Sequence, residues 1–183
     1  MKKTAFGLIV VLALASASFA PVTAATDAPL LVPGYPAASD VPGAKELPDP
    51  HMDYKVVFAD GQEAKSKSDI NPMLPSIAQY LNTLGKYGVP AAHRHIVIMF
   101  HQRNPDMDIV MTNEAYKARY GVDNPNIELL HALKTAGVDI RACGQGVLGR
   151  KIDLKDVNPE ITVDLWAMTT LVNLQLKGFV RVG

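Results

Sequence analysis

The chain has 183 residues, enough for one ordinary domain, and its 18 lysines and arginines are balanced by 18 aspartates and glutamates. This balance argues against a nucleic-acid or anionic-membrane partner, since either would favour a marked basic excess. There is one cysteine, Cys143, so an intramolecular disulfide is excluded. Its thiol is therefore free, joined to another molecule, or used in chemistry.

Residues 1–25 have the pattern of a cleaved export signal. Lys2 and Lys3 precede the apolar run 5–15, and small residues follow up to Ala24 and Ala25. An uncleaved anchor is the alternative, but the run is short for a bilayer span, which needs roughly 20 residues. We therefore expect cleavage near Ala24 or Ala25, a periplasmic or secreted mature protein, and no stable membrane insertion afterwards.

Residues 26–52 are expected to form a linker or a strap that lies over the domain. Six prolines fall between positions 26 and 50, and proline disfavours helix both at its own position and at the one before it. Apolar side chains at Leu30, Leu31, Val32 and Tyr35 would allow partial docking. The folded domain is placed at residues 53–183.

The first half of this domain predicts two strands and a helix. A β-prone strand at 54–58 is followed by a polar loop and then by a helix over 74–84, whose apolar residues recur with a 3.6-residue period. Asn71 and Pro72 suit the start of this helix. The nearly continuous apolar run 95–100 is typical of a parallel strand buried on both faces.

The second half continues the alternation. Residues 109–111 predict a short strand or a lead-in to the segment 114–120, and Asn124-Pro125 opens a helix that Gly137 closes. A strand at 138–142, a short helix or loop at 147–156 and a brief strand at 161–163 come next. Asp164 is expected to cap an apolar helix over 165–177, with Trp166 in the core, and 179–182 is the last strand.

Strands that alternate with helices predict a single doubly wound, mainly parallel α/β sheet with helices on both faces. Right-handed crossovers then place the ligand-facing loops at the carboxyl ends of the strands. The order of the strands in the sheet does not follow from the sequence.

Cys143 is the first candidate for chemistry, because it follows a strand directly and precedes Gly144-Gln145-Gly146. Glycines let the backbone turn tightly and expose its N–H groups, which would stabilise a thiolate. Basic residues nearby in the sequence could add positive potential: Arg141, Arg150 and Lys151. The alternative is a small buried residue at a tight turn, which is common for free cysteines.

Histidines provide two further candidates. His101 ends the second strand and could donate or accept a proton beside Cys143, or else be an exposed loop residue. His93 and His95 share one side of an extended segment and could bind a metal with His51 or His101 as a third ligand. A polar strand entrance is the favoured interpretation of this pair, so we expect no metal and no cofactor.

From Tyr54 onward the chain resembles the DsrE/DsrF-like family, including its YchN and TusD types. The likeness is carried by the strand ending in His101, the helix start around Asn126, the stretch 140–145 and the closing segment 178–180. The resemblance implies a doubly wound subunit that assembles into homo-oligomers, trimers or hexamers. It also implies a persulfide on Cys143, exchanged with sulfur donor and acceptor proteins. Residues that would shape the pocket are Gly144, Gln145, Gly146 and Asn126, with His101 or Gln145 assisting.

Two functions follow as hypotheses, and whether the protein is an enzyme is left open. The first is a periplasmic sulfur carrier that uses Cys143. The alternative is a non-catalytic, oligomeric module that binds a small ligand, suggested by the apolar helix over 165–176, which has more apolar surface than one buried face requires.

Overall fold

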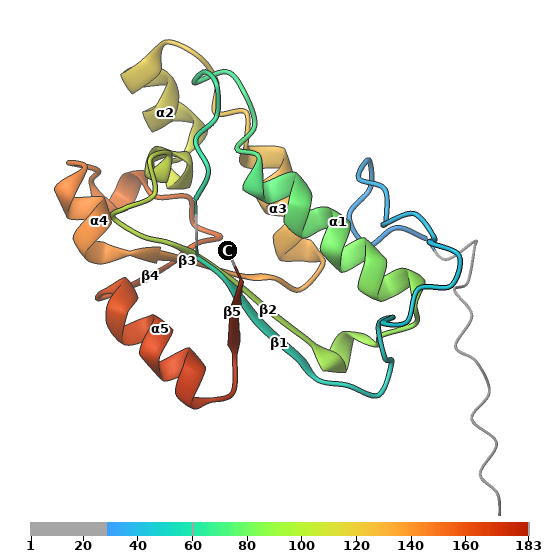
Figure 1. The fold of residues 1–183 in the computed structure, drawn as a ribbon. Coiled ribbons are helices and arrows are strands. Elements are labelled where there is room, and N and C mark those ends of the chain that lie inside the picture. Colours follow the sequence, from blue (N-terminus) through green and yellow to red (C-terminus); the bar gives the residue numbers. More distant parts are fainter. Residues whose placement is uncertain (1–28, 60, 183) are drawn as a thin grey trace, which may run out of the picture.

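The computed structural model describes residues 29–59 and 61–182 (Figure 1). The predicted export signal at 1–25 lies outside the described residues. No helix within the described part of the chain combines the length and apolar character needed to cross a membrane.

The described residues form one sheet of five parallel strands in the order β4-β3-β2-β1-β5. The strands are β1 (Tyr54–Phe58), β2 (Arg94–Phe100), β3 (Asp139–Cys143), β4 (Thr162–Asp164) and β5 (Val180–Val182). The long central strand β2 is buried on both faces, as its continuous apolar run predicts. The last strand of the chain therefore pairs with the first.

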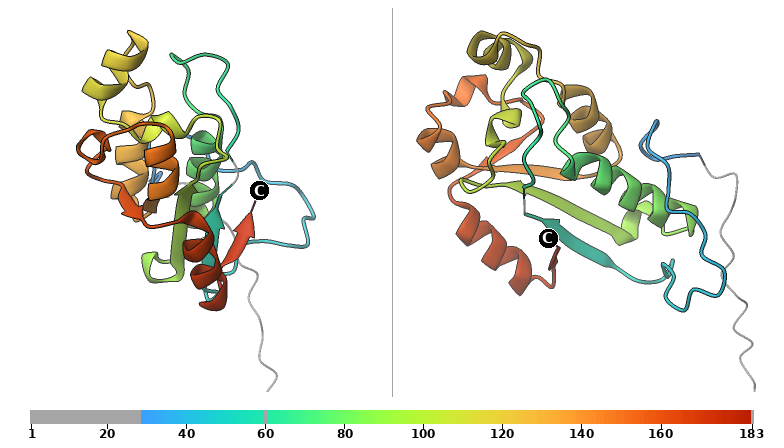
Figure 2. Two further views of the ribbon diagram at one scale, coloured as in Figure 1. Left: turned by 90° about the vertical axis from the view of Figure 1, so that its left-hand side faces the viewer. Right: turned by 45° about the horizontal axis from the view of Figure 1, so that its top comes forward.

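The helices are α1 (Met73–Lys86), α2 (Asn113–Tyr120), α3 (Ile127–Thr135), α4 (Gly144–Gly149) and α5 (Ala167–Leu176). Helices α1 and α3 lie together on one face of the sheet, and α5 lies on the other (Figures 1 and 2). Helices α1 and α3 lie in the connections from β1 to β2 and from β2 to β3, which run toward the β4 edge of the sheet. Helix α5 lies in the connection from β4 to β5, which runs the other way across the sheet. Because crossovers are right-handed, α5 therefore lies on the face opposite to α1 and α3. The predicted fold class, a doubly wound parallel sheet, is confirmed.

Side chains alternate between these two faces. Phe58 makes an edge-to-face contact with Tyr80 of α1, with ring centroids 5.7 Å apart, while Lys55 Nζ donates to the carbonyl of Lys177 just after α5. Through the strand register, Ile98 shares the α1 face with Phe58, and Arg181 shares the α5 face with Val57. The same alternation places Arg141 and Cys143 of β3 on the α5 face.

The proline-rich strap docks on α1. Asn82 of α1 is buried and its amide both accepts from Val32 N, at 2.9 Å, and donates to Val32 O, at 2.8 Å. Farther along, Ala38 N donates to Thr83 Oγ1 at 2.9 Å, and Lys86 pairs with Asp40 at 2.7 Å. The part of the strap around residues 32–40 is thus held to the domain by side chains of one helix.

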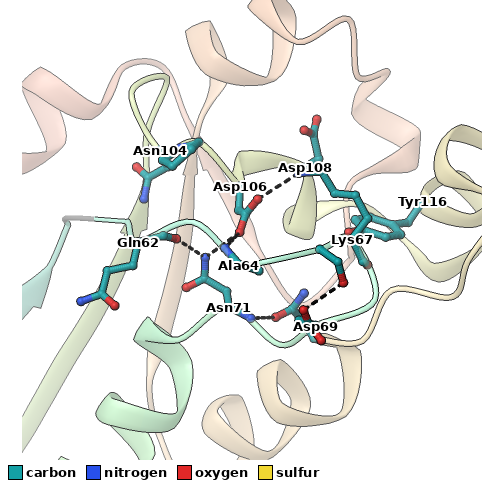
Figure 3. Close-up of polar contacts among 12 residues, drawn as sticks. Gln62, Ala64, Lys67, Asp69, Asn71, Asn104, Asp106, Asp108 and Tyr116 are labelled. Carbon is teal, nitrogen blue, oxygen red and sulfur yellow. Dashed lines mark hydrogen bonds and ion pairs between the residues drawn. The ribbon is translucent and has the colours of Figure 1, made fainter.

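A buried polar network joins the loop after β1 to the loop after β2 (Figure 3). The carboxylate of Asp106 accepts from Ala64 N at 2.5 Å, Lys67 Nζ at 2.9 Å and Asn71 Nδ2 at 3.2 Å. Asp108 accepts from Arg119 at 3.1 Å and from Arg150 at 2.9 Å. Both carboxylates are nearly inaccessible, and burial of a charge requires such partners. The network holds the carboxyl edge of the sheet in one shape.

Candidate functional site

A cavity of about 520 Å³ lies between α5 and the carboxyl ends of β1 and β2. Its walls come from segments far apart in the sequence: Gly61 after β1, the residues 101–103 after β2, one side of α5, and Arg181 of β5. The chain leaves β1 for one face of the sheet and reaches β5 from the other. Ligands of doubly wound folds bind at such a reversal of strand order.

Cys143 lies directly behind this cavity. It is the last residue of β3, its side chain is fully buried, and its Sγ accepts a hydrogen bond from Ala167 N at 3.2 Å. Ala167 is the first residue of α5 and lines the cavity, whereas Cys143 does not. The backbone N–H of the first residue of α5 therefore points at Sγ.

The three residues after Cys143, expected to shape the pocket, are not among the residues that line the cavity. Helix α4 begins at Gly144, where the sequence predicts a glycine turn followed by a later helix. A Cβ at Gly144 would lie 2.9 Å from the carbonyl oxygen of Asp164, so only glycine allows α4 this close to the chain that enters α5. Gln145 Nε2 donates to Leu165 O at 3.4 Å, and Gly146 is buried.

His101 and Cys143 leave neighbouring strands at the same level. The register pairs Phe100 with Ala142, and each candidate residue follows one position later. His101 lines the cavity, and its Nδ1 accepts from Arg103 N at 3.1 Å. Because this ring nitrogen is an acceptor, the proton of the neutral imidazole sits on Nε2. The structure thus brings the two residues to adjacent strand ends.

Two of the three basic residues near Cys143 in the sequence, Arg141 and Arg150, form ion pairs. Arg141 pairs with Asp139 at 2.6 Å and with Asp164 at 3.2 Å, and its hydrogen bond to Asp139 is the main cause that raises the pKa of the guanidinium. Arg150 pairs with Asp108. These carboxylates offset the charge of the two guanidinium groups locally. Arg141 and Arg150 are thus ion-paired side chains and not sources of unbalanced positive potential at the sulfur.

Asn126 lies at the start of α3, where its Oδ1 accepts from Asn71 N at 2.8 Å. It is fully buried and is not among the residues that line the cavity. Its contacts connect α3 to the chain that enters α1. They place Asn126 in the framework of the loops rather than at the cavity wall.

His93 and His95 both lie near the carboxylate of Asp53, at 2.9 Å and 3.7 Å. The expected placement of the two imidazoles on one side of the segment is confirmed. Within residues 29–59 and 61–182, no three side chains of histidine, cysteine, aspartate or glutamate come together to hold a metal ion.

The sequence analysis misplaced Trp166 and did not single out Arg103 or Arg181, and all three line the cavity. Trp166 was expected in the core of a helix starting at Asp164, but α5 starts at Ala167, and Trp166 lies before it, 37% exposed and lining the cavity. Asp164 does not cap α5 and instead accepts from Arg141 and from Thr170 Oγ1. The alternation of β5 could have pointed to Arg181, since its neighbours Val180 and Val182 are apolar.

Comparison with known proteins adds a family. A family model described as the DsrE/DsrF-like family matches residues 52–180. Among solved structures, the chain is similar to the protein of unknown function MTH1491 from Methanobacterium thermoautotrophicum, with 18% sequence identity and a TM-score of 0.49. The alignment covers 71% of this chain and 98% of that one. A comparison with curated proteins gave no match.

Proposed function

Because the chain belongs to the DsrE/DsrF-like family, we propose that it carries sulfane sulfur as a persulfide on Cys143. The observation that carries the proposal is the position of Sγ, which accepts a backbone N–H from the first residue of α5 beside the cavity. A sulfur anion at this position has a donor already aimed at it, and a cavity one residue away.

The transfer is an exchange between sulfur atoms. The thiolate of Cys143 attacks the outer sulfur of a donor persulfide, R–S–SH. The S–S bond of the donor breaks, its electron pair leaves on R–S⁻, and a new S–S bond forms on Cys143. The proton stays on the transferred sulfur, and no external oxidant or reductant is needed. An acceptor thiolate reverses these steps and removes the sulfur.

The burial of Sγ gives α5 a part in this exchange. Ala167 stands between the sulfur and the cavity, because it both donates to Sγ and lines the cavity wall. A donor therefore reaches Cys143 only when the first turn of α5 shifts. His101, at the neighbouring strand end, is placed to hold or return a proton during the exchange.

The setting belongs to the same proposal. The mature protein works in the periplasm or is secreted, after cleavage near Ala24 or Ala25, and it acts as a homo-oligomer of three or six copies. Its partners are a sulfur donor protein and a sulfur acceptor protein.

Mass spectrometry of the purified mature protein after brief exposure to polysulfide tests the carrier. We expect wild type to gain about 32 Da, one sulfur atom, and to lose it on reduction. The Cys143→Ser variant should gain nothing. As a matched control, a Cys143→Ser and Leu154→Cys double variant places the thiol on an exposed residue and should lose its adduct faster. A wild-type protein that gains no more mass on exposure to polysulfide than Cys143→Ser does contradicts the proposal.

Full burial of Sγ, together with an open cavity beside it, favours a second candidate. In this candidate the protein is an oligomeric module that binds a small ligand without sulfur transfer. A Cys143→Ala strain that keeps full biological activity would favour the module over the carrier. Sedimentation that shows only monomer would count against it.

A further inference from the structure

We propose that the cavity beside α5 binds a small organic anion with an apolar body. This inference deepens the ligand-binding candidate by naming the class of ligand, and it requires no persulfide. It rests on three properties of the cavity wall: its charge, its exposed apolar side chains and its size.

Two arginine side chains belong to the wall. Arg103, after β2, and Arg181, in β5, both line the cavity, and His101 lies beside Arg103. Guanidinium groups bind carboxylates, sulfonates and phosphates through paired hydrogen bonds, so the charged end of the ligand is an anion.

The remaining wall is apolar and unusually exposed. Met168 and Val172, one turn apart on α5, are 57% and 48% exposed, and Trp166 at the start of the helix is 37% exposed. Leu171 lies between them and faces the same cavity. Large apolar side chains gathered at a concave surface are typical of a binding site. An aromatic ring or an alkyl chain on the ligand would cover them.

The volume restricts the ligand further. A cavity of about 520 Å³ lies within the range of roughly 300 to 1,000 Å³ that holds small organic molecules. An inorganic anion would fill only a fraction of it and would leave the wall of α5 wet. The ligand therefore has both parts, a charged group near an arginine and an apolar body along α5.

A pair of dyes tests this inference on the whole mature protein. The probes are 8-anilinonaphthalene-1-sulfonate, an anion, and N-phenyl-1-naphthylamine, which has the same rings without the sulfonate. Trp166 is the one tryptophan of the chain and lines the cavity, so energy transfer from it to the dye reports binding, and the arginine variants below assign that binding to the cavity. We expect saturable binding of the anionic dye with one site per chain.

Four variants locate the contacts. Arg181→Gln or Arg103→Gln should raise the Kd of the anionic dye on the order of tenfold. The Kd of the neutral dye should change less than about twofold. Lys155→Gln removes an exposed cation that does not line the cavity, and it should leave both dyes unchanged. Cys143→Ser should also leave both unchanged, which separates this test from that of the persulfide.

Two outcomes overturn the inference. Equal binding of the two dyes, unaltered by either arginine variant, would show that the wall does not recognise charge. Binding that Leu176→Gln abolishes, together with self-association in sedimentation, would show that the exposed face of α5 is an interface between copies, since Leu176 is 81% exposed and lies off the cavity wall. Circular dichroism of each variant confirms that it is folded.

Discussion

The two faces of the sheet are covered to very different degrees. On the α1 and α3 face, the helices bury a continuous row of leucines, and the strap adds Val32 above them. On the other face, α5 is the only long helix among the described residues, and it buries Ala167, Thr170 and Leu174 while leaving a stripe of large apolar residues exposed. The exposed stripe is Leu165, Met168, Val172 and Leu176.

This difference assigns stability to the face covered by α1 and α3, and ligand binding to the face covered by α5. Two helices and a strap close one face and leave its side chains with little access to solvent. One helix of ten residues spans the opposite face, and the cavity opens along its side. The candidate chemistry, Cys143 and His101, lies at the edge of the open face, where packing leaves room for a ligand.

The largest expected effect compares the same substitution on both faces. Leu130→Ala on α3 should lower the free energy of unfolding by about 2–5 kcal/mol, because it leaves a cavity at a fully buried position. Leu176→Ala on α5 should change it by less than about 0.5 kcal/mol, because that side chain is mostly in solvent. Urea unfolding of both variants measures the difference, and equal losses would contradict the comparison.

A smaller effect is expected where the strap meets α1. Asn82→Ala removes the partners of the N–H and C=O of Val32 and should lower the free energy of unfolding by about 1–3 kcal/mol. The strap should then be cut faster by a protease, at residues around 32–40. Asn173→Ala, an exposed asparagine on α5, is the matched control and should alter neither measurement. If the strap of the Asn82→Ala variant resists cleavage as well as that of the wild type, other contacts hold the strap to the domain.

The smallest effect concerns Tyr116 of α2, whose hydroxyl donates to Lys67 O. Burial is the main cause that raises the pKa of Tyr116 from 10.0 to about 12. Between pH 10 and 12 the unfolded chain has lost this proton and the folded chain keeps it, so stability falls as pH rises through this window. Below pH 10 the neutral Tyr116 hydroxyl makes its full contribution to the free energy of unfolding.

Ultraviolet absorbance during alkaline titration checks this directly, since ionised tyrosine absorbs at longer wavelength. We expect the last tyrosine to ionise near pH 12 in the wild type, and Tyr116→Phe to remove that step. The variant should also lose less stability than the wild type between pH 10 and 12. A final step near pH 10 would mean that Tyr116 is open to solvent.

The local elements were largely predictable from sequence because their apolar patterns are strong. The strand at 54–58 has the predicted bounds, and the buried run of β2 is extended by one residue, Arg94. The helix α1 follows the 3.6-residue period of Leu74, Ile77 and Leu81 closely. Alternation of such elements was enough to predict the doubly wound sheet.

The candidate site was predictable only in part, because it depends on contacts between distant segments. The sequence places Cys143 and His101 at strand ends, but only the strand order shows that these ends are neighbours. The role of Arg181 requires the pairing of β5 with β1. Trp166 was misplaced because Asp164 is a residue type that suits a helix cap. In the structure the carboxylate of Asp164 accepts hydrogen bonds from Arg141 and Thr170 instead.

The pairing of β1 with β5 also makes the cavity depend on residues near the carboxyl end of the domain. Residues up to 177 include β1 to β4, Cys143 and its glycine neighbours, but not the strand that completes the cavity wall. A nascent or truncated chain that stops before Gly178 keeps Cys143 and lacks Arg181. Loss of β5 would therefore leave the sulfur covered by α5 and remove one of the two arginines of the cavity wall.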